Sequence, residues 1–145
     1  MTKTKPDMPA SLVSEVERLM KKAGEARRAG QGSASLAYSE EAWSLIPDPK
    51  TEWNFHPQTI ARGVVETIVE RQGCSVLDLW LDRMYQTYFD PDRLHTFTNM
   101  VAGEALLKCG RRDEAVAAFR RVLQQGGPSF FSGAYRPYLD LAEKG

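Results

Sequence analysis

Two histidines are the first candidates for metal or acid–base chemistry. His56 and His95 each lie near the predicted start of a helix, and neither has a second His or Cys at the spacing of metal ligands. Because metal centres need clustered ligands, both side chains are expected to be polar groups at helix ends. The sequence therefore predicts no metal site.

Two cysteines are the next candidates. Cys74 lies at the predicted start of a helix, where the helix dipole can lower the pKa of a thiol. A cysteine nucleophile also needs a base and an orienting partner, and the sequence has no signature for either. Cys109 precedes the turn glycine Gly110 and is expected to be a packing residue. The two cysteines form neither a CxxC pair nor a disulfide framework, which favours a reduced, cytoplasmic compartment.

The other patterns associated with catalysis are incomplete. The glycines of segment 30–32 follow a predicted helix instead of a strand and lack the Lys-Ser/Thr of a phosphate-binding loop. Asp78 and Asp82 lie one helical turn apart, and Glu40 precedes Glu41. Carboxylate pairs of this kind need a cleft and a raised pKa for catalysis, so we expect them on a solvated face. We predict no catalytic residue, no enzymatic activity and no cofactor.

Composition narrows the class of protein and of partner. The chain has 145 residues, of which 42% are hydrophobic and 26% charged, as in one soluble globular domain. Its 19 basic and 19 acidic residues cancel, whereas a nucleic-acid binder usually carries an excess of Lys and Arg. The N-terminus has no apolar signal region, and no apolar run approaches the length of a membrane span. We expect no nucleic-acid and no membrane partner.

Helical periodicity covers almost the whole chain. Apolar and small residues recur at intervals of three and four, and no segment alternates with a period of two. The sequence thus predicts an all-α domain of about seven helices. After a flexible lead-in over residues 1–10, the predicted antiparallel hairpins span about 11–47, 56–90 and 93–126, followed by a capping helix at about 133–143.

Two of these hairpins repeat the same pattern around a glycine. Gly30 and Gly110 each separate two predicted helices, and small or apolar residues stand at equal distances from them. The matched pairs are Ala23 and Gly103, Ser35 and Ala115, and Ala42 and Val122. A single helical hairpin cannot bury its apolar face alone, whereas stacked hairpins bury a continuous core.

This spacing resembles the tetratricopeptide repeat, with Phe119 at the position of its second-helix aromatic residue. The resemblance implies a stacked, TPR-like α-solenoid. It is good over 96–128 and fair over 16–47. It is poor between them, because a turn at Gly73 would put Glu66 and Asp78 where small residues are expected. We therefore expect a middle hairpin that is longer and degenerate, or that packs differently.

A second resemblance is to a group of small bacterial tetratricopeptide-like proteins, many of them encoded beside secreted Rhs-type toxins. The motif residues are Trp43, Pro47, Pro49, Lys50, Trp53, Gly126, Gly127, Phe130, Tyr138 and Leu139. The resemblance implies an immunity protein that binds and blocks a cognate toxin domain in the cytoplasm. The alternative is a TPR-type scaffold or chaperone adaptor that binds a peptide in its concave groove.

The repeat register also predicts which residues contact a partner protein. The first helix of each hairpin would line the concave side, with the residues Glu17, Arg27, Arg28, Glu70, Arg71, Phe97, Glu104 and Lys108. Arg111 and Arg112 form a basic zone suited either to solvent or to an acidic partner. Tyr85 and Tyr88 are expected to form an exposed patch, because they lie on different faces of a very apolar helix. The sequence leaves open which of these surfaces makes the contact, and the oligomeric state.

Overall fold

The computed structural model describes residues 5–68 and 71–145, whose regular secondary structure is entirely helical, with no strand. The all-α prediction is therefore confirmed. The helices are α1 (Ala10–Arg28), α2 (Gly32–Leu45), α3 (His56–Thr67), α4 (Arg71–Cys74), α5 (Leu77–Thr87), α6 (Thr96–Lys108), α7 (Arg112–Gly126) and α8 (Arg136–Lys144), with 3-10 turns η1 (Lys50–Glu52), η2 (Pro128–Phe130) and η3 (Gly133–Tyr135). None of the helices in these two ranges has the length and hydropathy needed to cross a bilayer.

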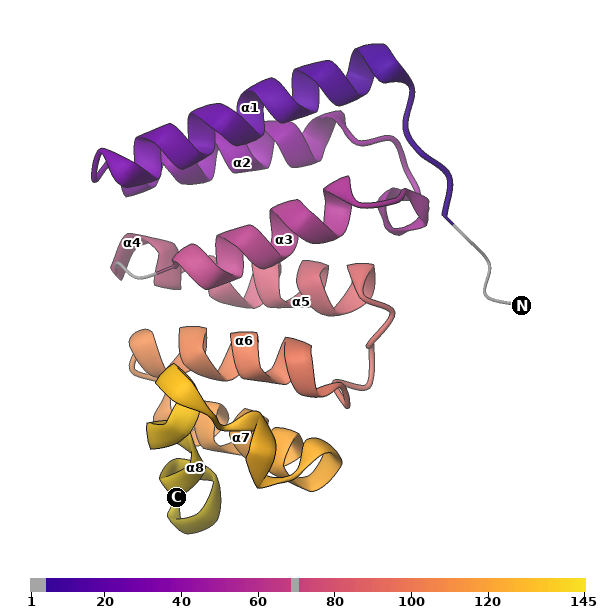
Figure 1. Cartoon of the computed structure of the whole chain (residues 1–145). Helices are drawn as coiled ribbons and strands as arrows, with labels where there is room; N and C mark the ends of the chain where they lie inside the picture. The colour runs from indigo at the N-terminus through magenta and orange to yellow at the C-terminus, as the bar shows by residue number, and fades with distance from the viewer. Residues whose placement is uncertain (1–4, 69–70) are drawn as a thin grey trace.

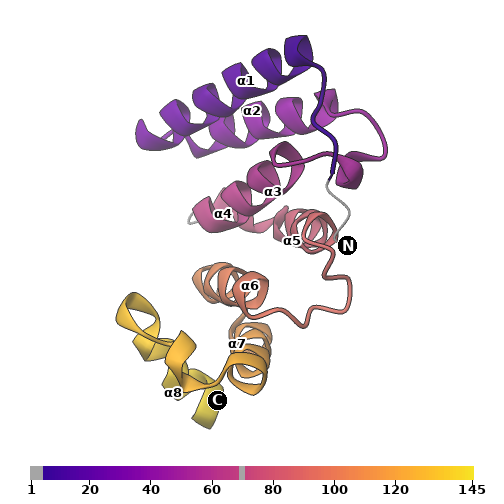
Figure 2. The ribbon, with the colours of Figure 1, turned by 45° about the vertical axis from the view of Figure 1, so that its right-hand side comes forward.

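Three antiparallel helix pairs lie in layers that follow the order of the chain (Figure 1). The pairs are α1 with α2, α3 with α5, and α6 with α7. Helix α3 contacts both α1 and α6, so it joins the outer layers (Figure 2). Helix α8 folds back against α7 at the C-terminal end. This order places the first helices of the three pairs next to one another.

The two glycine turns predicted from the repeat have the same backbone geometry. Gly30 and Gly110 both have a φ of +76°, the left-handed conformation that glycine adopts without steric cost. In the first turn, the N–H of Gln31 donates to the carbonyl of Ala26 at 2.8 Å. In the second, the N–H of Arg111 donates to the carbonyl of Leu106 at 2.9 Å. Both helices thus end in the hydrogen-bonding pattern of a Schellman motif.

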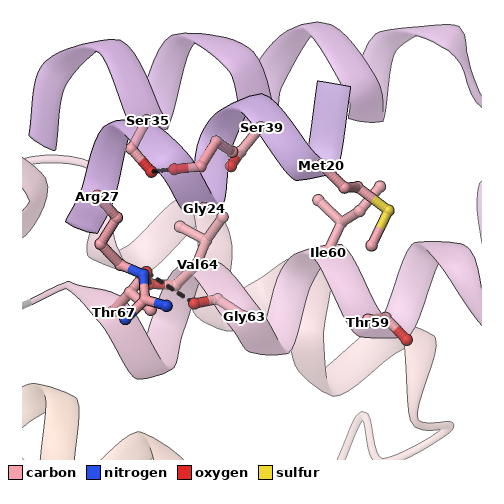
Figure 3. A pocket seen from close by; sticks show the side chains of 11 residues that line it. Met20, Gly24, Arg27, Ser35, Ser39, Thr59, Ile60, Gly63, Val64 and Thr67 are labelled. Carbon is pink, nitrogen blue, oxygen red and sulfur yellow. Dashed lines mark hydrogen bonds between the residues drawn. The ribbon is translucent and has the colours of Figure 1, made fainter. Parts of the chain in front are cut away.

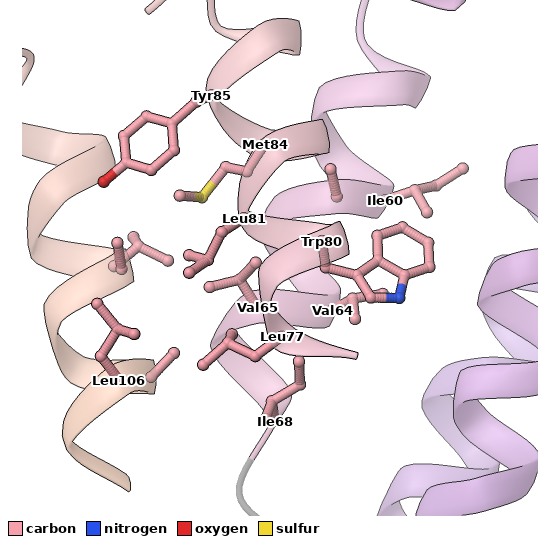
Figure 4. Close-up of a cluster of buried hydrophobic side chains, with 14 of the residues drawn as sticks. Ile60, Val64, Val65, Ile68, Leu77, Trp80, Leu81, Met84, Tyr85 and Leu106 are labelled. Atoms are coloured by element: carbon pink, nitrogen blue, oxygen red, sulfur yellow. The ribbon is translucent and has the colours of Figure 1, made fainter. Parts of the chain in front are cut away.

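The middle layer departs from the predicted helix boundaries. The hairpin predicted over about 56–90 was expected to turn at Gly73, but α3 already ends at Thr67. The one-turn helix α4 then precedes α5. A Cβ on Gly73 would lie 3.2 Å from the side chain of Ile68, so the chain turns back closely on itself here. The apolar faces of α3 and α5 still form the centre of the core, with Trp80, Leu81 and Met84 fully buried (Figure 4).

The cysteines form a disulfide, which corrects the prediction that they are separate, reduced residues. Cys74, the last residue of α4, is bonded to Cys109 at the end of α6, with a Cα–Cα distance of 5.6 Å. The residues are 35 positions apart, and only the packing of the middle layer on the last layer brings them together. Neither cysteine is a free nucleophile, and the pair does not favour a reducing compartment.

The segment between α5 and α6 is built around Asp90. The last hairpin was predicted to begin at about residue 93, but α6 begins at Thr96. The Asp90 carboxylate accepts hydrogen bonds from the N–H of Leu94 at 2.7 Å, the N–H of His95 at 3.1 Å and the hydroxyl of Thr98 at 2.7 Å. Burial alone would raise the pKa of Asp90, but these hydrogen bonds outweigh it and lower the pKa below its usual value.

The described part of the predicted flexible lead-in packs on the middle layer. The N–H of Asn54 donates to the carbonyl of Pro6 at 2.8 Å, and its side-chain amide donates to Asp7 at 3.0 Å. Met8 is buried, and the ammonium group of Lys5 donates to the carbonyl of Thr87 at 3.1 Å. Residues 5–9 therefore connect the start of α1 with the connector before α3 and with the end of α5.

Candidate functional site

The first helices of the three pairs form one face of the molecule, which we call the α1–α3–α6 face. Helix α3 lies at its centre, between α1 and α6 (Figure 1). The residues of these three helices that take part in the contacts described below include Met20, Gly24, Arg27, Thr59, Arg62, Gly63, Glu66, Thr67, Phe97, Glu104 and Lys108. The face contains two separate features, an aromatic cluster at the contact of α3 with α6 and a pocket at the contact of α1 with α3.

The aromatic cluster, which we call the Phe97 cluster, consists of Arg62, Glu66, Tyr88 and Phe97. The Phe97 side chain is 48% exposed, and its ring centre lies 5.8 Å from that of Tyr88. The Arg62 guanidinium lies 5.9 Å from the centre of the Phe97 ring, and its Nη1 donates to the Tyr88 hydroxyl at 3.2 Å. Arg62 Nε lies 3.3 Å from Glu66 Oε1, an ion pair that is not aligned as a hydrogen bond. Phe97 is thus an exposed ring held by neighbours from α3 and the end of α5.

The pocket lies between α1, α2 and α3 and has a volume of about 200 Å³ (Figure 3). Its walls are formed by Met20, Ala23, Gly24, Arg27, Ser35, Ser39, Thr59, Ile60, Gly63, Val64 and Thr67. Arg27 and Thr67 lie at one end, and Met20 and Ile60 lie at the other. The pocket therefore offers a cation at one end and apolar surface at the other.

The lower end of the face is partly covered by α8. The Tyr138 hydroxyl donates to Glu104 Oε2 at 3.0 Å, and the Tyr138 ring stacks on Phe119 at a centroid distance of 4.6 Å. Burial, followed by the hydrogen bond to the Glu104 carboxylate, raises the pKa of Tyr138 to about 12. Lys108 Nζ lies 3.6 Å from Glu104 Oε1. Glu104 is therefore already occupied by two neighbours of its own chain.

Several other predicted contact residues are also placed by the structure. Glu17 hydrogen-bonds His56 Nε2 at 3.0 Å, so it joins α1 to the start of α3. Arg27 lines the pocket, and Arg28 is exposed at the end of α1. Glu70 and the side chain of Arg71 lie outside the described residues.

The predicted exposed patch of Tyr85 and Tyr88 is wrong. Tyr85 is only 2% exposed, and its hydroxyl donates to Asn99 Oδ1 at 2.9 Å. Burial raises the pKa of this phenol, and the guanidinium of Arg93 covers its ring at 4.5 Å. A polar partner inside the protein accounts for the burial, which apolar periodicity does not reveal. Of the two tyrosines, Tyr88 alone lies in a surface cluster.

The predicted basic zone is partly neutralised. Arg111 Nη2 lies 2.8 Å from Asp78 Oδ1 and also pairs with Glu114, and these carboxylates raise the pKa of Arg111. Arg112 is exposed and makes no ion pair with a described residue. Arg111 therefore links the turn before α7 to α5, and Arg112 is the freer cation of the two.

Several residues of the site were not predicted as contacts from the sequence, among them Arg62, Ser39 and Gly63. A signal for two of them exists in α3, where polar or small residues recur at Thr59, Arg62, Gly63 and Glu66 opposite the apolar stripe. The sequence carries no signal for Ser39, because this residue of α2 lines the pocket only when α3, a helix of another pair, packs against it.

Among residues 5–68 and 71–145, no group of three His, Cys, Asp or Glu side chains is placed to hold a metal ion. Comparisons of the chain with protein-family models, with curated proteins and with solved structures found no match.

Proposed function

We propose that this chain is a protein-binding module and that its partner docks on the α1–α3–α6 face. The observation that carries the proposal is the half-exposed Phe97 ring, which Arg62 and Tyr88 hold in place. Aromatic and arginine side chains supply most of the binding energy at protein interfaces. A ring that is already ordered loses little conformational entropy when a partner covers it.

The layered helix pairs support a TPR-like stack as the scaffold for this face. The equivalent turns at Gly30 and Gly110 build the first and last pairs in the same way. The first helices of the three pairs, α1, α3 and α6, then present side chains on one side of the stack. Helical repeats form extended binding surfaces in this way.

Within this class, we propose an immunity protein that neutralises a cognate toxin domain by steric occlusion. The resemblance to toxin-associated proteins supports this role, and its motif residues build the scaffold. Trp53 Nε1 donates to the carbonyl of Pro47 at 2.9 Å, and Lys50 donates to the carbonyl of Ile46 at 2.6 Å. Because the motif shapes the connector between α2 and α3, partner specificity would come from the neighbouring face.

Co-expression with the toxin domain encoded beside the gene tests the immunity role. We expect the chain to restore growth and to elute with the toxin domain as a one-to-one complex. Unchanged toxicity together with the absence of a complex would contradict the proposal.

The contribution of Phe97 can be measured in the same complex. Replacing a central hot-spot residue costs about 2 kcal/mol or more, so Phe97→Ala should weaken the Kd at least about 30-fold. Leu79→Ala is the matched control, because Leu79 is 46% exposed but lies on α5, outside this face. Equal effects of the two substitutions would show that the partner does not dock on the α1–α3–α6 face.

The pocket favours a second candidate, a scaffold or adaptor that binds an extended peptide. A pocket on one side of α3 and an exposed aromatic ring on the other suit different side chains of one extended segment. This function predicts micromolar binding of short peptides, whereas an immunity protein would need the folded toxin domain. Titration with the intact domain and with its proteolytic peptides separates the two.

A further inference from the structure

We propose that the pocket between α1, α2 and α3 is a binding site for a carboxylate on a short aliphatic stem, supplied by a glutamate side chain of the partner. The inference rests on the proposed protein-binding function and adds the chemistry that one part of the face recognises. Four observations, on charge, hydrogen bonding, glycine placement and size, support it independently.

The first observation is an unpaired cation in a pocket without acidic residues. The Arg27 guanidinium lies at the polar end of the pocket and makes no hydrogen bond or ion pair with a described residue (Figure 3). None of the residues that line the pocket is an Asp or Glu. Glu66, on the adjoining turn of α3, pairs with Arg62 instead. A carboxylate entering the pocket would therefore find an available arginine, which suits carboxylate geometry better than lysine does.

The second observation is a hydroxyl in the pocket wall that makes no hydrogen bond with a described residue. Ser39 lines the pocket, is only 9% exposed and makes no hydrogen bond with a described residue. By contrast, Ser35 and Thr67 donate to the carbonyls of Ala23 and Gly63, both at 2.8 Å. Among the described residues only Arg62 Nε is a buried side-chain atom without a partner, so the Ser39 hydroxyl is open to the pocket and can donate to a ligand oxygen there.

The third observation is a helical glycine that packing does not require. A Cβ on Gly63 would meet no atom within 4 Å, although the residue lies inside α3. Glycine weakens a helix interior relative to alanine, and no close neighbour explains its presence here. The space that a side chain would occupy is the pocket itself. Gly63 therefore keeps the site open.

The fourth observation is the size and shape of the site. A volume of about 200 Å³ is smaller than the 300–1,000 Å³ typical of cofactor and drug sites, so one side chain fits and a cofactor does not. The apolar surfaces of Met20, Ile60 and Val64 suit the methylene groups of glutamate. A longer apolar side chain would fill the space but leave Arg27 without a counter-charge.

The site can be tested without the partner by amide NMR titration of the full chain. The probe is N-acetyl-L-glutamate N-methylamide, which carries the side-chain carboxylate on a blocked backbone. We expect saturable shifts at the amides of Gly24, Ser39 and Gly63, with a Kd on the order of 1 mM for so small a ligand. The neutral glutamine analogue should bind at least tenfold more weakly. N-acetyl-L-leucine, whose carboxylate is terminal, should bind more weakly than the glutamate probe.

Three variants make the test specific to the pocket. Arg27→Gln should weaken probe binding at least tenfold, while Lys21→Gln, which removes an exposed cation of α1 outside the pocket, should leave it unchanged. Gly63→Leu should place a side chain in the pocket and abolish the shifts without lowering the Tm. Equal binding of the glutamate and glutamine probes, or tighter binding of acetyl-leucine, would overturn the inference, as would an unaltered Kd for Arg27→Gln.

The NMR titration tests the glutamate site, and the partner-binding experiment tests the docking face, so the two proposals can fail independently. If partner binding depends on Phe97 but the probe does not bind, the face is an interface and the glutamate site is wrong. If the probe binds as expected but Phe97→Ala leaves the partner affinity unchanged, the pocket is real and the proposed docking face is wrong.

Discussion

At the scale of single residues, Asn99 organises the buried polar groups beneath the segment between α5 and α6. The residue has no exposed surface, and its side-chain amide donates to the carbonyls of Arg93 and His95 at 2.9 and 2.8 Å. Its carbonyl accepts from the Tyr85 hydroxyl and from Arg121 Nε. One side chain therefore satisfies groups from α5, the connecting segment and α7.

Asn99→Ala should lower the free energy of unfolding by about 2–3 kcal/mol, because it leaves several buried groups without partners. Urea unfolding monitored by circular dichroism measures the change. Asn54→Ala is the control, since it removes an exposed hydrogen bond to Asp7 and should change stability by less than about 0.5 kcal/mol. A loss below about 0.5 kcal/mol for Asn99→Ala would show that the network is not stabilising.

Two helical glycines should respond in opposite directions to the same substitution. Gly63→Ala should stabilise the protein by about 0.5–1 kcal/mol, because its Cβ enters open space and helix propensity improves. Gly103→Ala should destabilise it by about 1–3 kcal/mol, because its Cβ would lie 2.5 Å from Phe119. The measurement is the change in Tm of each variant relative to the wild type, in one buffer. Changes of the same sign would contradict this account of the packing.

At the scale of secondary-structure elements, the start of α6 depends on a charged side chain. Asp90 holds the N–H groups of Leu94 and His95 and the hydroxyl of Thr98 from a position six residues before the helix begins. Because the folded pKa of Asp90 lies below its unfolded value, the carboxylate stabilises the fold when it is ionised. The stabilisation is present above the unfolded pKa of about 4 and is lost as the pH falls through the folded value.

Asp90→Asn should therefore reduce stability at pH 6 and reduce it less at pH 2.5, because the unfolded wild-type carboxyl is protonated there and ionisation on folding costs free energy. The measurement is the difference in urea unfolding free energy between the two proteins at each pH, which cancels the contribution of the other carboxylates. A difference that does not shrink on acidification would show that the Asp90 charge contributes nothing.

At the scale of the whole molecule, side chains join each layer to the next. Arg83 of α5 pairs with Glu40 of α2 and lies over the rings of Trp43 and Trp80, at 4.9 and 4.5 Å. The disulfide between Cys74 and Cys109 joins the middle layer to the last one. Neither link includes the Phe97 cluster or the pocket, so the proposed binding face and the scaffold contacts are separate.

Removal of the disulfide should test that separation. A crosslink between residues 35 positions apart restricts the unfolded chain, so the double variant Cys74→Ser/Cys109→Ser should lose about 3–4 kcal/mol of unfolding free energy. We expect the folded variant to retain Phe97-dependent partner binding. Dithiothreitol should lower the stability of the wild type and leave the double variant unchanged. Equal stability with and without reductant would show that the crosslink contributes little.

The sequence alone determined the all-α class, most helix positions and the two turns at Gly30 and Gly110. These features depend on residues close together in the chain, through apolar periodicity and the left-handed geometry of glycine. The repeat register also predicted that α1, which carries Arg27, and α6, which carries Phe97, flank the first helix of the middle pair, and α3 does contact both.

Only the tertiary structure decided the burial of Tyr85, the pairing of Cys74 with Cys109 and the existence of the pocket. Tyr85 can be buried because Asn99, on the next helix pair, accepts a hydrogen bond from its hydroxyl group. The pocket brings Arg27 close to Ser39 and Gly63, which belong to two other helices. Such features arise from distances between helices, whereas periodicity reports only which side of one helix faces the core.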